Sequence, residues 1–416
     1  MTKQLAGILL CLFFFMARQA VAHSALKPDF NSLNNSFKFK KDSVTHERDI
    51  IDEFHILFNN RNHPHIYKPS TKTGRFHFAA IPAAGYSLQT GFAGVLASNA
   101  VFYTDEKDSS KASSILASVA FTQYSQIILP LNADIWTKGE KYNIIVDYRY
   151  MNYPTQTFGL GLRTKLTDGY NIDYSYLKIH QAVLRNLTHN FFLGGGYYYD
   201  YLWNEREIDP PQNIQTGFEK YGLHSNETAS GFCLQGLFDN RENQVNPMGG
   251  FYANLRLRAN YKWMGSSTRW ESGILDMRKY FRFPENSHNI IALWSYNWIT
   301  FGGRPPYLLL PSTGWDDYFN TGRGYLQGRY RSKDMSYLEA EYRFQILRNG
   351  LLGGVVFGNL QTFSRDIYNQ YANFIPGYGL GIRVKMNKHS STNLCIDYGF
   401  GNEGSRGFFV NLGEVF

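Results

Sequence analysis

Cysteine is scarce in this chain, with three among 416 residues. Cys11 lies in an N-terminal segment that we expect to be removed, which leaves Cys233 and Cys395. Two cysteines exclude a disulfide-rich scaffold and supply no Cys-x-x-Cys pair for a metal. We expect both thiols to be packed or to face lipid, with a bond between them as the alternative. The sequence predicts no metal site and no cofactor.

Long apolar runs are absent beyond the N-terminus. Residues 1–22 have the features of a secretory signal peptide, with Lys3, an apolar run over residues 6–16 and a small-residue site that ends at Ala22. This run is too short to cross a bilayer as a helix, and no later run reaches about 18 apolar residues. The sequence therefore predicts export without a transmembrane helix, and an uncleaved N-terminal anchor is the alternative.

Acidic residues are outnumbered, because 34 Asp and Glu face 42 Lys and Arg, for a net charge of +8. A basic excess can indicate a nucleic-acid partner, but an exported protein rarely meets one. We predict no nucleic-acid partner. The excess cations are expected in loops and in a lumen, where they would favour anionic lipid headgroups.

Aromatic residues are abundant, at 17% of the chain, and from about residue 74 the apolar pattern has a period of two. In "FYANLRLRANYKW", residues 251–263, apolar side chains occupy one face and Arg256 and Arg258 the other, as in a β-strand. Soluble strands are typically about 5–6 residues long, so a longer strand favours a barrel. An arginine facing lipid costs about 2–4 kcal/mol at mid-membrane, so we expect both arginines in a lumen.

Sixteen segments follow this pattern, and bacterial barrels have an even number of strands. They are residues 90–104, 113–124, 125–136, 141–150, 156–166, 169–185, 189–204, 227–240, 249–263, 267–282, 288–301, 335–347, 351–363, 374–386, 391–400 and 406–416. The sequence thus predicts an all-β fold, a 16-stranded antiparallel transmembrane β-barrel over residues 74–416. Counting back from a periplasmic C-terminus places residues 104–113, 204–225 and 302–334 outside the cell. The same count makes residues 152–157, 283–288, 348–350 and 387–391 periplasmic turns.

Residues 23–73 are polar and differ from the barrel. One segment, "RDIIDEFHILF", predicts a short amphipathic helix over residues 50–58. About 50 residues with one short helix cannot bury much of a core, so we predict a short periplasmic N-terminal extension rather than a domain. The helix is expected to dock under the barrel or to recruit a partner. His55, His63 and His65 are interpreted as solvated loop histidines rather than metal ligands.

Three passages carry motifs. They are "RGY" at Arg323, Gly324 and Tyr325; "DNRENQVNPMGGFY" with Asp239, Arg241, Pro247 and Gly249; and "GSRGFFVNLGEVF" with Gly413 and Phe416. With them, residues 74–416 resemble the barrel of the BamA/TamA outer-membrane assembly superfamily, also called bacterial surface antigen. The opening "FHFAAIPAAGYSLQTGFAGVL" is similar to barrels of its Bacteroidetes-type branch. The extension is too short for the periplasmic POTRA domains that BamA and TamA carry.

The resemblance implies that the sixth extracellular loop folds into the lumen and that Arg323 docks on its wall. Its expected partners are Glu339 and Glu341 on one strand and Phe357 and Asn359 on the next. The family pattern F-x-D-x-G reads Phe-Gly-Asn-Leu-Gln here, from residue 357 to 361. The aspartate is therefore missing, and Glu339 or Glu341 is expected to supply the carboxylate. The alternative is a solvated loop tip.

The closing strand is expected to present Phe408, Val410, Leu412 and Phe416 to lipid, while Gly413 can bend or unpair. In the family this strand pairs poorly with the first strand, which leaves a lateral seam. The alternative is that Phe416 only marks the chain as a substrate of the assembly machine.

By resemblance, the chain is an outer-membrane barrel of a Gram-negative bacterium that serves outer-membrane protein assembly or envelope lipid homeostasis. The implied partners are outer-membrane lipids (lipopolysaccharide and phospholipid) and a client barrel protein or a periplasmic partner. A passive pore is the alternative function, and the cationic lumen face would suit it. We predict no enzymatic activity, because no Ser-His-acid pattern surrounds His180 or His189.

Overall fold

Sixteen long strands and one short strand form a single antiparallel sheet in the computed structural model, which describes residues 47–50, 52–53, 77–87, 90–104, 111, 113–211, 215–222, 226–364, 373–388 and 391–416. The strands are β1 (His77–Ser87), β2 (Gly91–Phe102), β3 (Ser113–Thr122), β4 (Ile127–Trp136), β5 (Tyr142–Asn152), β6 (Thr155–Thr157), β7 (Tyr170–Thr188), β8 (Phe191–Ile208), β9 (Asn226–Asp239), β10 (Gly250–Asn260), β11 (Trp270–Arg282), β12 (Ile290–Gly303), β13 (Asp334–Gln345), β14 (Leu352–Phe363), β15 (Ile375–Asn387), β16 (Thr392–Phe400) and β17 (Arg406–Leu412). The predicted all-β fold with sixteen long antiparallel strands is confirmed.

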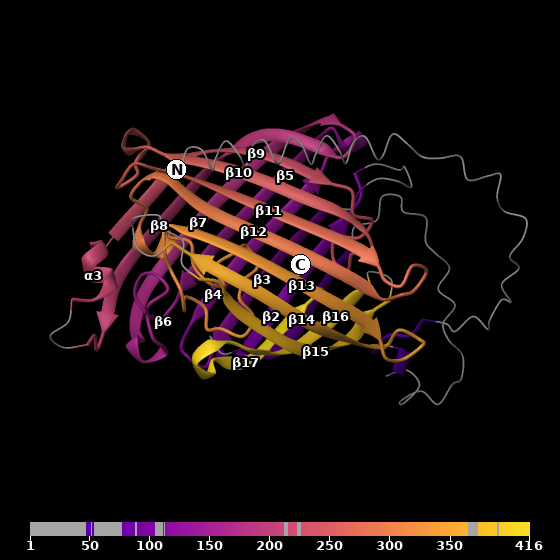
Figure 1. Cartoon of the computed structure of the whole chain (residues 1–416). Helices are drawn as coiled ribbons and strands as arrows, with labels where there is room; N and C mark the ends of the chain where they lie inside the picture. The colour runs from indigo at the N-terminus through magenta and orange to yellow at the C-terminus, as the bar shows by residue number, and fades with distance from the viewer. Residues whose placement is uncertain are drawn as a thin grey trace, which may run out of the picture.

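Each long strand pairs with the next one along the chain, from β1–β2 to β16–β17, and β5 pairs directly with β7. The sheet curls into a tilted barrel (Figure 1). The first and last strands, β1 and β17, form the two edges of the sheet and lie against each other. No hydrogen-bonded ladder joins them in the part of the chain that the structure describes. We call this junction the seam.

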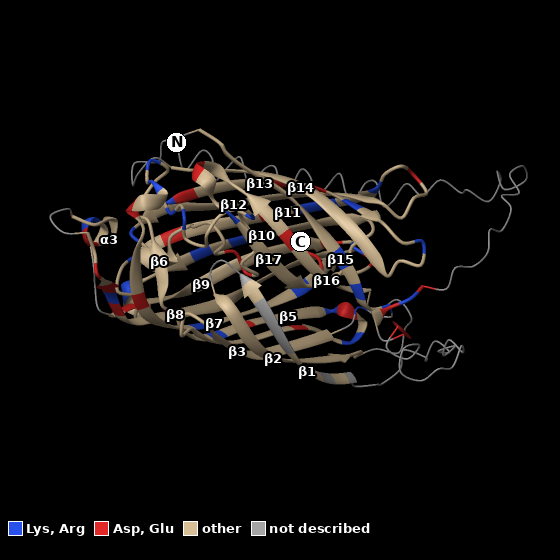
Figure 2. Ribbon diagram, turned by 90° about the horizontal axis from the view of Figure 1, so that it is seen from below, with Lys and Arg blue, Asp and Glu red and all other residues tan. Residues whose placement is uncertain are grey.

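Side chains alternate between the two faces of the barrel wall, which explains the period of two in the sequence. On β13, Leu338 and Ala340 are exposed on the outside, whereas Glu339 and Glu341 are buried inside. This inverts the arrangement of a soluble protein, because the apolar face is the outer one. Figure 2 shows the acidic and basic residues at the ends of the barrel and interspersed along its strands.

The helical elements are short. Among the described residues, and apart from residues 50, 52 and 53, they are α3 (Gly217–Tyr221) and the 3₁₀ turns η2 (Lys138–Glu140), η3 (Leu166–Asp168), η4 (Lys262–Met264), η5 (Tyr307–Leu309) and η6 (Asn402–Gly404). Within the described ranges, no helix is both long and apolar enough to cross a membrane.

The strand predicted over residues 156–166 is wrong, although the total of sixteen holds. Only Thr155–Thr157 are extended there, as β6, and the missing strand is replaced by β1 at the start of the barrel. Gly159 and Gly161 have φ of +90° and +84°, a left-handed conformation that ends a strand. Gly161 instead donates its N–H to the carbonyl of Arg331, 2.8 Å away.

Because the barrel starts one strand earlier and has no long strand at residues 156–166, two connections lie at the opposite end of the barrel from the end predicted. The end of the barrel that carries α3 and residues 304–333 is called the loop end, and the opposite one is the turn end. Lys111, predicted outside with residues 304–333, lies at the turn end, where its N–H donates to Glu140 at 3.0 Å and its Nζ to the Asp239 carbonyl at 3.1 Å. Residues 152–157, predicted as a periplasmic turn, lie at the loop end, where the Tyr153 hydroxyl donates to Gln327 at 2.6 Å.

A short part of the N-terminal extension is described and docks at the turn end, opposite α3 (Figure 1). The Lys388 N–H donates to Asp49 at 3.0 Å, and its ammonium group donates to Asp52 at 2.7 Å. The Arg48 N–H donates to the Asn349 carbonyl at 3.0 Å. Residues 50, 52 and 53 are helical; the signal peptide and the rest of the predicted helix lie outside the described residues.

Candidate functional site in the lumen

The connection between β12 and β13, residues 304–333, folds back into the barrel. Arg323 and Tyr325 are buried there, with 1% and 2% of their surfaces exposed. We call residues 304–333 the lumen loop. A solvated loop tip, the alternative interpretation of the RGY motif, is therefore wrong.

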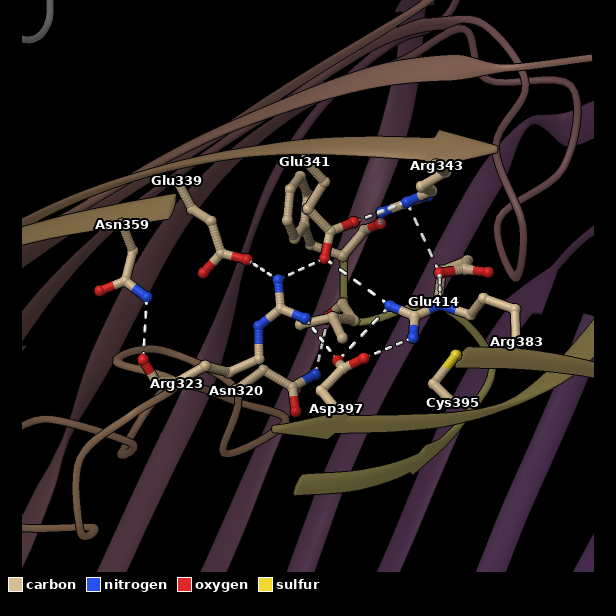
Figure 3. A network of polar contacts seen from close by, with 12 residues as sticks. Asn320, Arg323, Glu339, Glu341, Arg343, Asn359, Arg383, Cys395, Asp397 and Glu414 are labelled. Atoms are coloured by element: carbon tan, nitrogen blue, oxygen red, sulfur yellow. Dashed lines mark hydrogen bonds and ion pairs between the residues drawn. The ribbon is translucent and has the colours of Figure 1, made fainter. Parts of the chain in front are cut away.

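Arg323 docks in a cluster of three carboxylates on the barrel wall (Figure 3). One guanidinium nitrogen donates to both Glu339 and Glu341 of β13, and the other donates to Asp397 of β16 at 2.5 Å. The planar guanidinium can contact several carboxylates at once, which a lysine ammonium on a flexible stem cannot do as well. The cluster joins the lumen loop to two non-adjacent strands.

Phe357 and Asn359 of β14 complete the pocket around Arg323. The guanidinium carbon lies 3.7 Å from the centre of the Phe357 ring, within cation–π range. Asn359 does not replace a carboxylate, because its amide donates to the backbone carbonyl of Arg323 at 3.0 Å. An ionised aspartate could not donate that bond, so the amide suits this chain, in which Asp397 supplies a carboxylate.

Glycines on both sides allow this close approach. Gly324 has φ of +106°, and a Cβ there would lie 2.6 Å from the Phe400 carbonyl oxygen. On the wall, a Cβ at Gly399 would lie 2.6 Å from the Gly324 nitrogen. The adjacent Tyr325 hydroxyl donates to the Pro376 carbonyl at 2.5 Å. The RGY turn therefore fits a groove lined by glycine.

A further set of charges continues from the cluster to the closing strand (Figure 3). Arg343 donates to Glu341 at 2.6 Å, and Arg383 donates to Asp397 at 2.5 Å and to Glu414 at 2.9 Å. All of these side chains are buried. Through Asp397 and Arg383, these contacts join Arg323 of the lumen loop to Glu414 after β17 in one ion-pair network. Removing one member of such a network leaves its partner as an uncompensated buried charge.

The chain turns into the lumen after β17, which corrects the prediction that Phe416 faces lipid. β17 ends at Leu412, and Gly413 comes next with φ of +90°. This bend breaks the alternation, so Phe416 is 3% exposed and its ring stacks on Trp294 at 5.1 Å. We call residues 413–416 the inward tail. Phe408 and Leu412, before the bend, are exposed on the outside as expected.

A second contact holds the lumen loop to the opposite wall. Asp317 pairs with Arg256 of β10 at 2.6 Å and lies 3.9 Å from Lys178 of β7. Arg149 of β5 donates to the backbone carbonyl of Asp317 at 2.5 Å. The loop is therefore held to one wall through its own cation, Arg323, and to the opposite wall through its own anion, Asp317. It crosses the lumen between these two contacts.

The turn between β9 and β10, which carries the second motif, reaches the inward tail. Asp239 accepts two hydrogen bonds from the Arg241 side chain at 2.9 Å, which close the turn on itself. The Glu414 N–H donates to the Val245 carbonyl at 3.0 Å. Pro247 is buried. Gly249 has open space where a Cβ would be, so the turn does not require a glycine there. The position that favours glycine is the next residue, Gly250, which has φ of +102°.

The remaining lumen wall holds a cluster around Asp200 of β8. Its carboxylate accepts from Tyr176 at 2.5 Å, pairs with Arg258 at 2.6 Å and contacts His180 at 3.0 Å. Arg256 and Arg258 thus both face the lumen, as predicted. Cys233 and Cys395 are free, buried thiols, so the alternative of a bond between them is wrong.

The residues of this site that were not predicted from the sequence include Asp397, Arg383, Glu414 and Asp317. Asp397 and Arg383 left a signal, because each is a charged residue that alternates with apolar neighbours on its strand, Ile396 and Tyr398 for Asp397 and Ile382 and Val384 for Arg383. Glu414 left none, because its direction depends on the bend at Gly413. Asp317 lies in a loop, where no periodicity indicates a direction.

No protein-family model and no curated protein sequence matches the chain. Among solved structures, the chain is similar to BamA from Haemophilus ducreyi lacking POTRA domains 1-3, with a TM-score of 0.53 and 12% identity over 81% of this chain and 70% of that one. It is also similar to CdiB from Acinetobacter baumannii, with a TM-score of 0.51 and 13% identity over 82% of this chain and 60% of that one. The likeness shows a shared fold.

Proposed function

We propose that the chain is an outer-membrane β-barrel of the BamA/TamA superfamily that acts in the assembly of outer-membrane proteins. The observation that carries this proposal is the seam, where β1 and β17 lie together without a ladder among the described residues. A strand edge with unpaired backbone groups can pair with an added strand. The seam could therefore accept a strand of a client barrel protein.

The inward tail supports this role, because it withdraws the end of β17 from the wall. Only Arg406–Leu412 are extended in β17, against eleven residues in β1. A β17 of seven residues leaves part of the longer β1 edge with no strand beside it. The same opening would face lipid, so envelope lipid homeostasis is the second function that the seam favours.

A passive pore is less well supported, because the lumen loop crosses the barrel and is anchored on both walls by Arg323 and Asp317. The proposal places the chain in the outer membrane of a Gram-negative bacterium, in contact with lipopolysaccharide and phospholipid. It includes no nucleic acid, no cofactor and no catalytic step. Docking of residues 47–50 and 52–53 at the turn end suggests a periplasmic surface for a partner.

A depletion strain tests the proposal. If the chain assembles proteins, depletion lowers the amount of folded barrel proteins in the outer membrane before permeability changes. A shift of phospholipid to the outer leaflet at constant protein levels would contradict protein assembly and support lipid homeostasis. A change in solute permeability alone would contradict both and leave the pore.

A further inference from the structure

A cavity of about 980 Å³ lies at the loop end, apart from the Arg323 network. Among the described residues it is lined by the connection before β7, by α3 and by the first and last residues of the lumen loop, Arg304 and Lys333, which we call its two feet. Binding sites for small molecules are typically clefts of about 300–1,000 Å³. The cavity therefore has room for a ligand of at least two sugar rings.

Three cations surround this cavity, namely Lys220 of α3, Arg304 and Lys333. Among the described residues, none of the three has a carboxylate oxygen within 4.0 Å, whereas Arg323 and Arg256 inside the lumen are both paired. Asp168 is the one acidic residue among the described lining residues. Three cations around one cavity, none of them in a direct ion pair among the described residues, favour the binding of an anion.

The cavity wall also has aromatic and hydroxyl groups. Phe158, Tyr170 and Tyr221 line it, and the Arg304 guanidinium lies 4.7 Å from the centre of the Tyr221 ring. The side chains of Tyr170 and Tyr221 are buried against this cavity. Aromatic side chains with a few polar groups are a typical lining of a small-molecule site, and the tyrosine hydroxyls can hydrogen-bond to hydroxyl groups of a ligand.

We propose that this cavity binds a phosphorylated saccharide. The phosphate would pair with Arg304, Lys220 and Lys333, because phosphate oxygens take charge-assisted hydrogen bonds from these groups. The sugar rings would lie against the aromatic wall. The ligand is either the headgroup of a lipid in the surrounding leaflet or a soluble sugar phosphate. This assignment goes beyond the assembly role and depends on the proposed outer-membrane location only for the lipid source.

The position of the cations adds a consequence for the lumen loop. Arg304 directly follows β12 and Lys333 directly precedes β13, so they stand at the two feet of the loop. A bound phosphate would contact both feet and tie them together. A ligand that binds only the folded chain raises its stability, so saturation should raise the temperature of unfolding.

The test is calorimetric titration of the full chain in detergent micelles with four probes. They are a phosphorylated glucosamine disaccharide, the same disaccharide without phosphate, inorganic phosphate, and the disaccharide as a lipid-linked headgroup. We expect saturable binding of the phosphorylated disaccharide, of its lipid-linked form, or of both. Tighter binding of the lipid-linked form than of the soluble form assigns the lipid headgroup, and equal or tighter binding of the soluble form assigns a soluble sugar phosphate.

The double variant Lys220→Gln/Arg304→Gln should weaken this binding about tenfold or more, because each substitution removes a charge-assisted hydrogen bond to the phosphate. The matched control is Lys262→Gln, an exposed cation on another connection of the loop end that does not line the cavity. The control should bind as the unmodified chain does. Equal weakening in the control, equal affinity for inorganic phosphate or for the unphosphorylated sugar, or no saturable binding would overturn the proposal. None of these outcomes depends on whether the chain assembles proteins.

Discussion

Removing the Arg323 side chain should destabilise the barrel more than any other single change in the lumen. Arg323→Ala leaves three buried carboxylates without their shared cation, but the loss is unequal. Asp397 keeps Arg383 at 2.5 Å, and Glu341 keeps Arg343 at 2.6 Å. Among the described residues, Glu339 keeps only the hydroxyl of Tyr337. The cost is therefore concentrated on Glu339, which becomes a buried charge without a cation.

Breaking a buried ion pair by removing one partner costs about 3–5 kcal/mol, and we expect Arg323→Ala to lose that much free energy of unfolding. The double variant Arg323→Ala/Glu339→Gln should recover part of the loss, because it removes the uncompensated charge. The free energy of unfolding of Arg323→Lys should lie between that of Arg323→Ala and that of the unmodified chain. A lysine can pair with one carboxylate, but it stacks less well on Phe357.

The assay is urea unfolding of the purified barrel in micelles, monitored by heat-modifiable migration on a gel. Glu341→Gln is a useful comparison, because it removes a carboxylate that lies near three cations, Arg323, Arg343 and Arg383. If Arg323→Ala unfolds at the same urea concentration as the unmodified chain, the lumen network does not stabilise the barrel. If adding Glu339→Gln makes Arg323→Ala worse, the assignment of the cost to Glu339 is wrong.

Three further changes test other contacts. Asp317→Asn should release the lumen loop from the cationic wall and give a flickering, larger current in planar bilayers; a quiet, unchanged baseline would show that this anchor is dispensable. Gly324→Ala should cost about 1–3 kcal/mol of stability, because the residue has a positive φ and a Cβ would lie 2.6 Å from the Phe400 carbonyl oxygen; Gly358→Ala, with open space around it, is the neutral control, and equal stability of the two variants would contradict the steric argument. Burial raises the pKa of Asp52 while the hydrogen bond from Lys388 lowers it, and the net pKa is lowered. The docking made by Asp49 and Asp52 should therefore be complete above about pH 5 and weaken as the pH falls below about 4. Protease access to this segment measures the docking, and a Lys388→Gln variant that keeps the same pH dependence would refute the assignment.

The sequence predicted the strands well because the two faces of a barrel wall differ so clearly in polarity. The exception is residues 156–166, whose apolar and polar residues alternate as in a strand. Gly159 and Gly161 adopt left-handed conformations there, which the periodicity of the sequence does not reveal. These residues pack on the lumen loop instead, where the Arg329 side chain donates to the Thr164 hydroxyl at 2.9 Å. The contact belongs to tertiary structure, and no local pattern indicates it.

The candidate site was predicted in part for a related reason. Glu339 and Glu341 could be placed inside because they alternate with apolar residues on one strand. Glu414 and Phe416 could not, because a single glycine at 413 turns the last three residues of the chain into the lumen. Asp317 and its cationic wall are far apart in the sequence, so only the folded barrel brings them together.

The central claim is that the seam between β1 and β17 opens during function, and a disulfide lock tests it most directly. Cysteine pairs that combine one position of residues 78–82 with one of residues 408–411 would join the two strands, in a background with Cys233→Ser and Cys395→Ser. The control pair, Ala97→Cys with Ser118→Cys, joins β2 to β3, which are already paired in the ladder. We predict that the oxidised seam lock fails to rescue a depletion strain, that reductant restores rescue, and that the control pair rescues under both conditions. Full rescue by a barrel whose seam is covalently locked would contradict the account.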